Sequence, residues 1–169
     1  MIICGIISAI LGLVLYIVGI ATNAWMSVGY QESGLWRVCG TIFGVTQCVP
    51  TLGISLLPGA FNAARAFAVI GLVLLLPGIA VACFAAKKNS DKGKRLVGND
   101  HCWRSGICGA LAGAIYAGYA KSYAIAPGVS VPFGYSFYMI WVQALFTWVG
   151  GGVITNAGSS DVQVDPEGQ

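Results

Sequence analysis

Four long apolar segments dominate the pattern of the chain, and the stretches between them collect charged residues, cysteine and turn-forming glycine. The segments cover residues 2–24, 63–86, 105–125 and 136–155. Each is close to the roughly 20 helical residues that cross a hydrocarbon core of about 30 Å. The third and fourth carry more glycine and polar-tipped side chains than the first, and tilting accommodates their uncertain ends. The pattern predicts a mainly α-helical membrane protein with four transmembrane helices.

The composition strengthens this prediction. Hydrophobic residues make up 57% of the 169 residues and charged residues only 9%, against about 25% charged in soluble domains. The mean hydropathy is +0.78, and little of the chain is left for a separate soluble domain. A cleaved signal peptide is an alternative for the first segment. It is disfavoured because no basic residue precedes the segment, which also exceeds the usual apolar core of about 7–15 residues.

The basic residues indicate how the chain is oriented. Six of the nine lie in the segment 87–104: Lys87, Lys88, Lys92, Lys94, Arg95 and Arg104. The positive-inside rule therefore predicts that this segment is a cytoplasmic loop. Both termini are then cytoplasmic, residues 25–62 and 126–135 form extracellular loops, and residues 156–169 are expected to be a disordered tail. Contact of the basic loop with anionic lipid is a second interpretation, less favoured than a topological role.

The first extracellular loop contains Cys39 and Cys48. An oxidising compartment lets a disulfide persist, and Gly40 and Gly44 between the cysteines suggest a hairpin turn. Such a bridge stabilises by about 2–3 kcal/mol in the chain-entropy model. Alternating residues predict short strands at about 25–31, 34–39 and 45–49, which form a small antiparallel sheet. The uncharged run 52–61 is expected to be a short helix on the membrane surface.

The other four cysteines fall near the predicted cytoplasmic ends of spans: Cys4, Cys83, Cys102 and Cys108. Juxtamembrane cysteines are candidates for palmitoylation, and Cys83 and Cys102 are the best placed. The alternative is that they serve as small packing residues.

Small residues predict close helix packing within the spans. Gly5, Gly12 and Gly19 recur every seven residues, and Gly109 and Gly113 have the small-x-x-x-small spacing that lets helices approach. Contacts inside one bundle are the favoured interpretation, with homodimerisation as the alternative.

A set of residues around the first extracellular loop resembles a known signature: Trp25, Gly34, Leu35, Trp36, Cys39, Cys48 and Arg65. It is similar to the signature of claudins, in the superfamily that also holds the peripheral myelin and epithelial membrane proteins. A weaker similarity continues at residues 119–122, Pro127 and 134–141. The resemblance implies a left-handed four-helix bundle that carries a mostly extracellular sheet. It also implies that the tryptophans and Leu35 anchor the sheet and that Arg65 fixes the top of the second span.

The resemblance further implies a multi-pass plasma-membrane protein at cell–cell junctions. Such a protein self-associates laterally, and across cells, to form or regulate a paracellular barrier or pore. The extracellular charges are few, namely Glu32, Arg37, Arg65 and Lys121, so we expect a barrier or at most a weakly anion-preferring pore. The second extracellular loop is short for a claudin, and the end at Gln169 is not the hydrophobic PDZ-binding sequence typical of claudins.

A different class of function stays open: an auxiliary subunit or regulator of another membrane protein, such as an ion channel. A transporter is less favoured because the spans contain no buried ion pair. The sequence contains no catalytic motif, so no enzyme is expected, and neither a cofactor nor a nucleic-acid partner. His101 with Cys102 and Cys108 would need a fourth ligand to hold a metal, so no metal site is predicted either.

Overall fold

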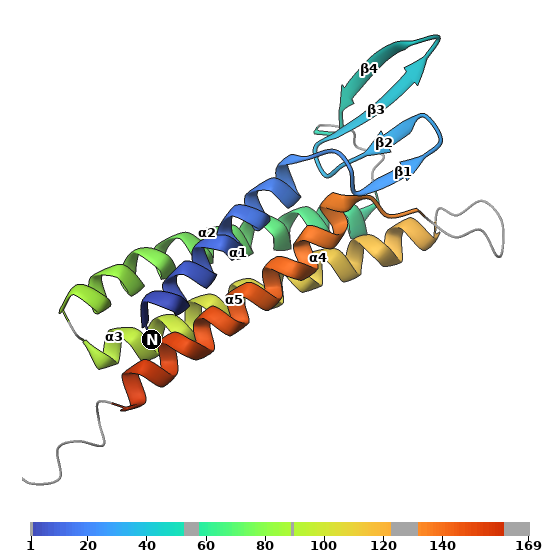
Figure 1. Cartoon of the computed structure of the whole chain (residues 1–169). Coiled ribbons are helices and arrows are strands. Elements are labelled where there is room, and N and C mark those ends of the chain that lie inside the picture. Colours follow the sequence, from blue (N-terminus) through green and yellow to red (C-terminus); the bar gives the residue numbers. More distant parts are fainter. Residues whose placement is uncertain (1, 53–57, 89, 123–131, 161–169) are drawn as a thin grey trace, which may run out of the picture.

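The computed structural model describes residues 2–52, 58–88, 90–122 and 132–160. Four long helical segments run side by side, and a small sheet stands at one end of this bundle (Figure 1). The helical elements are α1 (Ile2–Ala21), α2 (Gly59–Lys88), α3 (Asp91–Leu96), the π-helix η1 (Val97–Cys102), α4 (Trp103–Ser122) and α5 (Tyr135–Ser160). The chain therefore has the predicted mainly helical architecture with a small antiparallel sheet.

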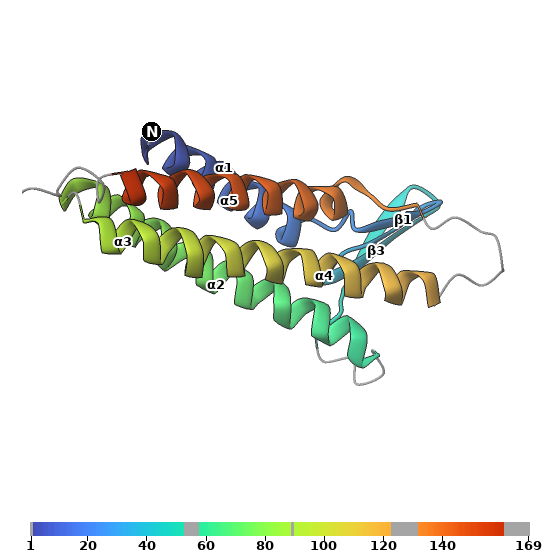
Figure 2. The ribbon, with the colours of Figure 1, turned by 90° about the horizontal axis from the view of Figure 1, so that it is seen from below.

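Helix α4 differs from the other long helices in composition. Among the described helices, α1, α2 and α5 are long and apolar enough to cross a membrane, and α4, the predicted third span, is not one of them. Its glycines, tyrosines and Lys121 lower its hydropathy. It nevertheless packs along both α2 and α5 (Figure 2). Its small residues are therefore covered largely by protein. The left-handed sense of the bundle stays a prediction.

Glycine allows α1 to approach α5 closely. Gly5, Gly12 and Gly19 are buried and face α5. A Cβ atom at Gly5 would lie 2.8 Å from Cγ1 of Ile154, and one at Gly12 would lie 2.8 Å from Cγ2 of Thr147. Real Cβ atoms essentially never come this near, so larger residues would push the two helices apart. The seven-residue glycine repeat therefore serves a contact within the chain.

The segment 87–104, predicted to be the cytoplasmic connection between two spans, is mostly helical. Lys87 and Lys88 form the last turn of α2, and α3, η1 and α4 follow one another from Asp91 to Ser122. Ser90 caps this second helical segment by accepting a hydrogen bond from the backbone N–H of Gly93. The turns that follow pack against α2 and α5, and this burial favours helix where the charges alone suggest a loop.

Helix α5 continues to Ser160, five residues past its predicted end. Residues 156–160 are thus helical rather than part of a disordered tail, and residues 161–169 lie outside the described part. The end of α5 and the start of α1 lie at the same end of the bundle, opposite the sheet (Figure 1).

The sheet is a four-stranded antiparallel meander with the order β1-β2-β3-β4. Its strands are β1 (Met26–Val28), β2 (Gln31–Ser33), β3 (Arg37–Ile42) and β4 (Val45–Pro50). The sequence predicts three strands, and this is wrong in two places. Gly29, at φ 59°, turns the chain and divides the first predicted strand into β1 and β2. Residues 34–36 precede β3 because their backbone and side chains bind the helices instead.

Two further predictions fall partly outside the described residues. For the predicted surface helix 52–61, residues 53–57 are not described, and residues 59–61 belong to the first turn of α2 rather than to a separate helix. For the predicted loop 126–135, residues 126–131, with Pro127, are not described. Phe133 forms an isolated bridge with Met26 of β1, and Tyr135 begins α5.

Candidate functional site at the base of the sheet

Two tryptophan side chains close the carboxyl end of α1. The last carbonyl groups of an α-helix have no partner within the helix. The indole N–H of Trp25 donates to the carbonyl of Gly19 at 2.8 Å, and the indole N–H of Trp36 donates to the carbonyl of Ile20 at 2.7 Å. Two points of the segment between α1 and α2 that lie 11 residues apart are thereby bound to one turn of α1.

Arg65 of α2 holds the same segment from a second helix. Its Nε donates to the carbonyl of Leu35 at 2.7 Å and its Nη2 donates to Oγ1 of Thr51 at 2.5 Å. The Thr51 hydroxyl in turn donates to the carbonyl of Leu35 at 3.3 Å. The guanidinium carbon lies 4.5 Å from the ring centroid of Phe61 and 5.7 Å from that of Trp36. Nη1 donates to Oδ1 of Asn62 at 3.3 Å. The cation is thus partnered by three oxygen acceptors and lies near two rings, which suits a charge at the mouth of a helix bundle.

Trp25 also joins the sheet to the remaining helices. Its side chain is fully buried, with its ring centroid 4.8 Å from that of Tyr116 of α4 and 6.2 Å from that of Phe137 of α5. Both contacts have the edge-to-face geometry that adds about 0.5–1.5 kcal/mol to simple burial. The hydroxyl of Tyr116 donates to the carbonyl of Ser33 at 3.4 Å. One indole therefore contacts α1, α4 and α5.

Two glycines let the backbone pass close to the end of α1. A Cβ atom at Gly34 would lie 2.6 Å from Cα of Asn23, and one at Gly134 would collide with the carbonyl oxygen of Ala24. The backbone N–H of Gly134 donates to the carbonyl of Trp25 at 3.1 Å. Glycine is required at these two positions by close approach rather than by a positive φ.

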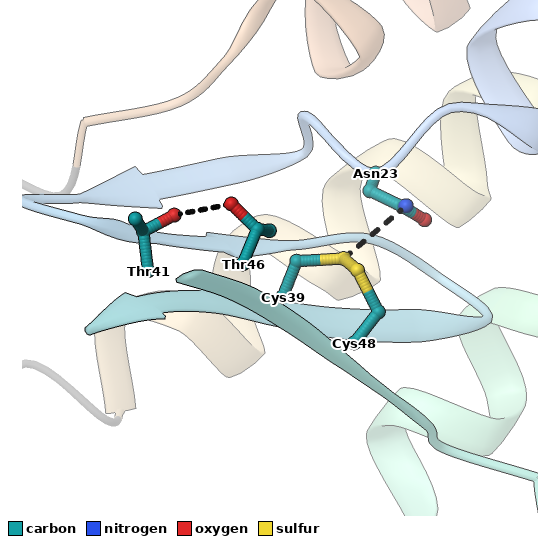
Figure 3. The surroundings of a disulfide bond; sticks show 5 residues. All are labelled: Asn23, Cys39, Thr41, Thr46 and Cys48. Carbon is teal, nitrogen blue, oxygen red and sulfur yellow. Dashed lines mark hydrogen bonds between the residues drawn. A yellow bond between two sulfur atoms is a disulfide. The ribbon is translucent and has the colours of Figure 1, made fainter. Parts of the chain in front are cut away.

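The predicted disulfide between Cys39 and Cys48 is present, and it joins directly opposed residues of β3 and β4 (Figure 3). The amide of Asn23 points at the sulfur of Cys39, with Nδ2 3.6 Å from Sγ. Two residues further along β3, the hydroxyls of Thr41 and Thr46 lie 2.9 Å apart in a cross-strand hydrogen bond. The bridge thus fixes β4 to β3 close to the point where β3 meets the end of α1.

Beyond the disulfide, the β3–β4 hairpin projects from the bundle with exposed apolar side chains. Ile42, Phe43 and Val45 are 69%, 101% and 62% exposed. A groove of about 390 Å³ lies among Ile42, Phe43, Val45, Gly40 and Gln47. No aspartate, glutamate, lysine, arginine or histidine occurs from residue 38 to residue 52. The surface of this hairpin is therefore uncharged.

The two predicted palmitoylation candidates lie in different surroundings. Cys83 of α2 is exposed, whereas Cys102 in η1 is fully buried. The side chain of Cys102 lies against Gly151 of α5. The buried sulfur of Cys102 lacks the access that acylation needs, so Cys83 is the better placed of the two candidates, and its acylation stays a prediction.

The two glycines predicted to pack helices both face α5. Gly109 lies against the amide nitrogen of Gln143, and a Cβ atom at Gly113 would lie 3.1 Å from Nε1 of Trp141. Both positions are buried within the single chain.

The only histidine of the chain, His101, contacts the backbone of α2 near Pro77. Nδ1 of His101 lies 3.2 Å from the carbonyl of Leu74, in the turn of α2 that precedes Pro77. Within the described part of the chain, no group of three histidine, cysteine or acidic residues is arranged to hold a metal ion.

Sequence reasoning missed three residues of the site: Asn23, Thr51 and Tyr116. Thr51 is buried and completes the Arg65 contact, although its position just after a proline reads as an ordinary turn. Tyr116 meets Ser33 across 83 positions of sequence, which no local pattern shows. For Asn23 there was a signal, because a polar residue just past an apolar helix often contacts backbone or neighbouring polar groups.

The chain is similar in sequence to known claudins. The chain is 37% identical to claudin-18 of Bos taurus over 93 residues, which cover 49% of this chain and 36% of the relative. It is 30% identical to claudin-18 of Mus musculus over 131 residues, 67% of this chain and 50% of the relative. Its match to claudin-11 of Homo sapiens, at 28% identity over 173 aligned positions, covers 89% of this chain and 80% of the relative. The chain thus spans about half or less of the claudin-18 sequences and most of claudin-11.

The family comparison covers nearly the whole described structure. The model of the PMP-22/EMP/MP20/Claudin family matches residues 1–154, from the start of α1 to the last turns of α5. The match includes both tryptophans, the disulfide and Arg65, so it contains every contact that fixes the sheet to the helices. The chain belongs to the PMP-22/EMP/MP20/Claudin family.

Proposed function

We propose that the protein forms a tight-junction barrier in which the sheet faces the space between neighbouring cells. Family membership supports a junctional role, and the relatives include claudin-11 and claudin-18. The observation that carries the proposal is the uncharged β3–β4 hairpin, which projects beyond the rigid base of the sheet. In this proposal the chain has no catalytic role.

The proposed orientation places the sheet outside the cell and both termini in the cytoplasm. The lysines at the end of α2 lie at the opposite end of the bundle from the sheet, as do the start of α1 and the end of α5 (Figure 1). The positive-inside rule assigns the basic end to the cytoplasm. A disulfide in the sheet fits the oxidising exterior. An Asn-x-Thr acceptor inserted at the Phe43–Gly44 turn would be glycosylated in this orientation and unmodified in the opposite one.

The absence of charge on the hairpin supports a barrier rather than a selective pore. Ion-selective paths use charged side chains or oriented dipoles at the constriction. The groove at the hairpin is lined by glycine, apolar residues and the neutral amide of Gln47. The extracellular charges that remain lie at the base of the sheet or on helix ends, among them Arg37 at the start of β3. Their small positive excess allows at most a weak preference for anions.

Expression in a leaky epithelial layer tests this proposal. We expect transepithelial resistance to rise and dilution potentials to show little selectivity or a slight anion preference. Two variants at one groove position, Gln47→Glu and Gln47→Lys, serve as a matched pair. If the hairpin lines the path, the first shifts permeability towards cations and the second towards anions. A strong cation preference of the unmodified protein would contradict the proposal.

Barrier formation in this proposal requires side-by-side self-association, and contact across cells as well. Freeze-fracture of cells that express this chain alone distinguishes barrier formation by self-association from the role of an auxiliary subunit. Continuous intramembrane strands are the expected result. Isolated particles, together with co-purification of a channel, would instead indicate a protein that regulates a partner.

A further inference from the structure

A groove that the junctional role does not use lies between the end of α1 and the underside of the sheet. Its volume is about 490 Å³, within the range of about 300–1,000 Å³ typical of small-molecule sites. Its lining comes from α1, from the connection after it, from the residue before β3 and from the first residue of β3: Ile17, Ile20, Ala21, Asn23, Trp36 and Arg37. The lining is apolar on the helix side and polar on the sheet side.

The helix side of the groove is continuous with the outward face of α1. Ile3, Ile7, Ile10 and Val14 are 67%, 53%, 41% and 52% exposed, and Ile17 continues the series at 44%. In a helix that spans the bilayer, such a stripe faces lipid chains. The groove therefore opens towards hydrocarbon at its lower end. An aqueous solute would meet an apolar wall there.

The sheet side of the groove presents an uncompensated cation. Arg37 is exposed, and its side chain has no hydrogen bond or ion pair within the described residues. The one acidic residue of the described sheet, Glu32, lies opposite Cys39 and does not form an ion pair with Arg37. Asn23 adds an amide whose nitrogen lies 3.6 Å from the sulfur of Cys39, and its second N–H is available to another acceptor. A guanidinium and an amide N–H together form a donor set for a phosphate oxygen pair.

The wall between these two sides is held rigidly. Trp36 lines the groove while its indole N–H is bound to the carbonyl of Ile20 and its ring lies 5.7 Å from the Arg65 guanidinium carbon. Tryptophan is favoured where headgroups meet hydrocarbon. The groove therefore keeps its shape at the depth where a phosphate group of the bilayer lies.

We propose that this groove binds one phospholipid from the leaflet on the sheet side. Its phosphate accepts hydrogen bonds from the Arg37 guanidinium and the Asn23 amide, and one acyl chain runs along Ile17 and Ala21. Charge complementarity selects the phosphate, and the continuity with the outward face of α1 selects a lipid over a free anion. The proposal does not rest on the junctional function, because the barrier is argued from the uncharged hairpin and the orientation from the basic end of the bundle.

Lipid binding to the purified, delipidated full chain tests this inference, with native mass spectrometry as the readout. Three probes are compared: a phosphatidylcholine, a diacylglycerol with the same chains, and glycerophosphocholine, which has the headgroup without chains. We expect one tightly held phosphatidylcholine and weaker retention of both other probes. If diacylglycerol is retained as well as phosphatidylcholine, the proposed role of the phosphate is overturned. Equal binding of glycerophosphocholine would overturn the choice of a lipid.

Substitutions locate the binding site. Arg37→Gln is expected to weaken phosphatidylcholine binding about tenfold, because it removes the charge-assisted hydrogen bonds. Lys121→Gln is the matched control, since it removes an exposed cation at the same end of the bundle but outside the groove. Ala21→Trp fills the exposed helix side of the groove and should weaken binding while Arg37 stays in place.

Folding effects are kept separate from binding. Arg37→Lys keeps the charge but loses the bidentate guanidinium donor. Its affinity for phosphatidylcholine should therefore lie between those of the unmodified chain and Arg37→Gln. Thermal melting of each variant shows whether it is folded. Equal binding by Arg37→Gln and Lys121→Gln, or unchanged binding by Ala21→Trp, would overturn the assignment of the lipid to this groove.

Discussion

The base and the tip of the sheet lie within one small domain but are built in opposite ways. At the base, Trp25 and Leu35 are fully buried, and the indole, guanidinium and hydroxyl groups around them have hydrogen-bond partners. At the tip, Ile42 and Phe43 are exposed, and the strands are held by their ladder and by one disulfide. The base resembles a protein core, whereas the tip resembles an interaction surface.

This difference separates the residues that make the fold from those that decide what the fold does. The residues at the base contact α1, α2, α4 and α5, so a change there alters the position of the whole sheet. A change at the tip alters only the surface that the sheet presents. The family model matches the helices and the whole sheet, base and tip alike. The match therefore identifies the scaffold and says little about selectivity.

The largest expected effect comes from Trp25. Trp25→Ala should lower the free energy of unfolding by about 3–5 kcal/mol, because it leaves a large cavity and frees the Gly19 carbonyl. Trp25→Phe keeps most of the ring and should cost less. Thermal unfolding in detergent measures both. At the tip, Phe43→Ala serves as the comparison and should change stability by less than about 0.5 kcal/mol. Similar losses at the two positions would contradict the division between base and tip.

Arg65 should give the next largest effect. Arg65→Leu leaves the Leu35 carbonyl and the Thr51 hydroxyl without their charged donor, at a cost of about 2–3 kcal/mol. Arg65→Lys keeps the charge but not the planar guanidinium group with its several N–H donors, and should lower the free energy of unfolding by less than Arg65→Leu does. Arg37→Leu removes an equal charge from the same face of the membrane and should cost little. Unfolding midpoints in one detergent allow the three variants to be ranked, and equal midpoints for the two leucine variants would argue against an anchoring role.

Removal of the disulfide should act locally. Joint replacement of Cys39 and Cys48 with alanine should cost about 2–3 kcal/mol in the chain-entropy model. Because the bridge joins only β3 and β4, amide hydrogen exchange should rise in these strands, while the amides of α1 and α2 keep their protection. General loss of protection throughout the helices would mean that the tip supports the base, contrary to the comparison above.

Much of the base of the sheet can be predicted from the sequence because the base is built from residue types that are rare in proteins. Two tryptophans and a cysteine pair in a loop beside an apolar helix have few uses other than anchoring and cross-linking. The partners of these residues are harder to predict. The tryptophans bind the backbone carbonyls of Gly19 and Ile20, and because every helix end has such carbonyls, the sequence does not mark these two. Tyr116 comes near Ser33 only when the helices are packed. Long-range contacts of this kind depend on the assembled bundle rather than on local pattern.

Other differences have local causes. Gly29 adopts a positive φ within a run that alternates like one strand, and so produces two strands. Ser90 begins a helix in a segment whose lysines suggest a loop. Cys102 lies beside a basic stretch yet points into the bundle, because the π-helical turn that contains it packs against α5. Charge density and apolar periodicity do not show which face of such a turn is covered.

Substitutions of Phe43 should change the free energy of unfolding least, and the informative result is whether each one stabilises or destabilises the chain. Phe43 has φ 50° and is followed by Gly44 at φ 77°, so both central residues of this hairpin turn have positive φ, a geometry that favours Asn-Gly. The ring is fully exposed, so little burial is lost on its removal. Phe43→Asn should therefore stabilise the chain by about 0.5 kcal/mol, whereas Phe43→Val, β-branched at a positive φ, should destabilise it.

The same two variants test whether the tip contacts another molecule. An exposed aromatic side chain that is kept in an unfavourable backbone conformation indicates a use that outweighs its cost. If Phe43→Asn raises the unfolding temperature and lowers transepithelial resistance, the ring is an interaction residue. If Phe43→Asn raises both the unfolding temperature and the transepithelial resistance, or leaves the resistance unchanged, the tip is only the end of a hairpin. Barrier formation must then depend on the sides of the sheet.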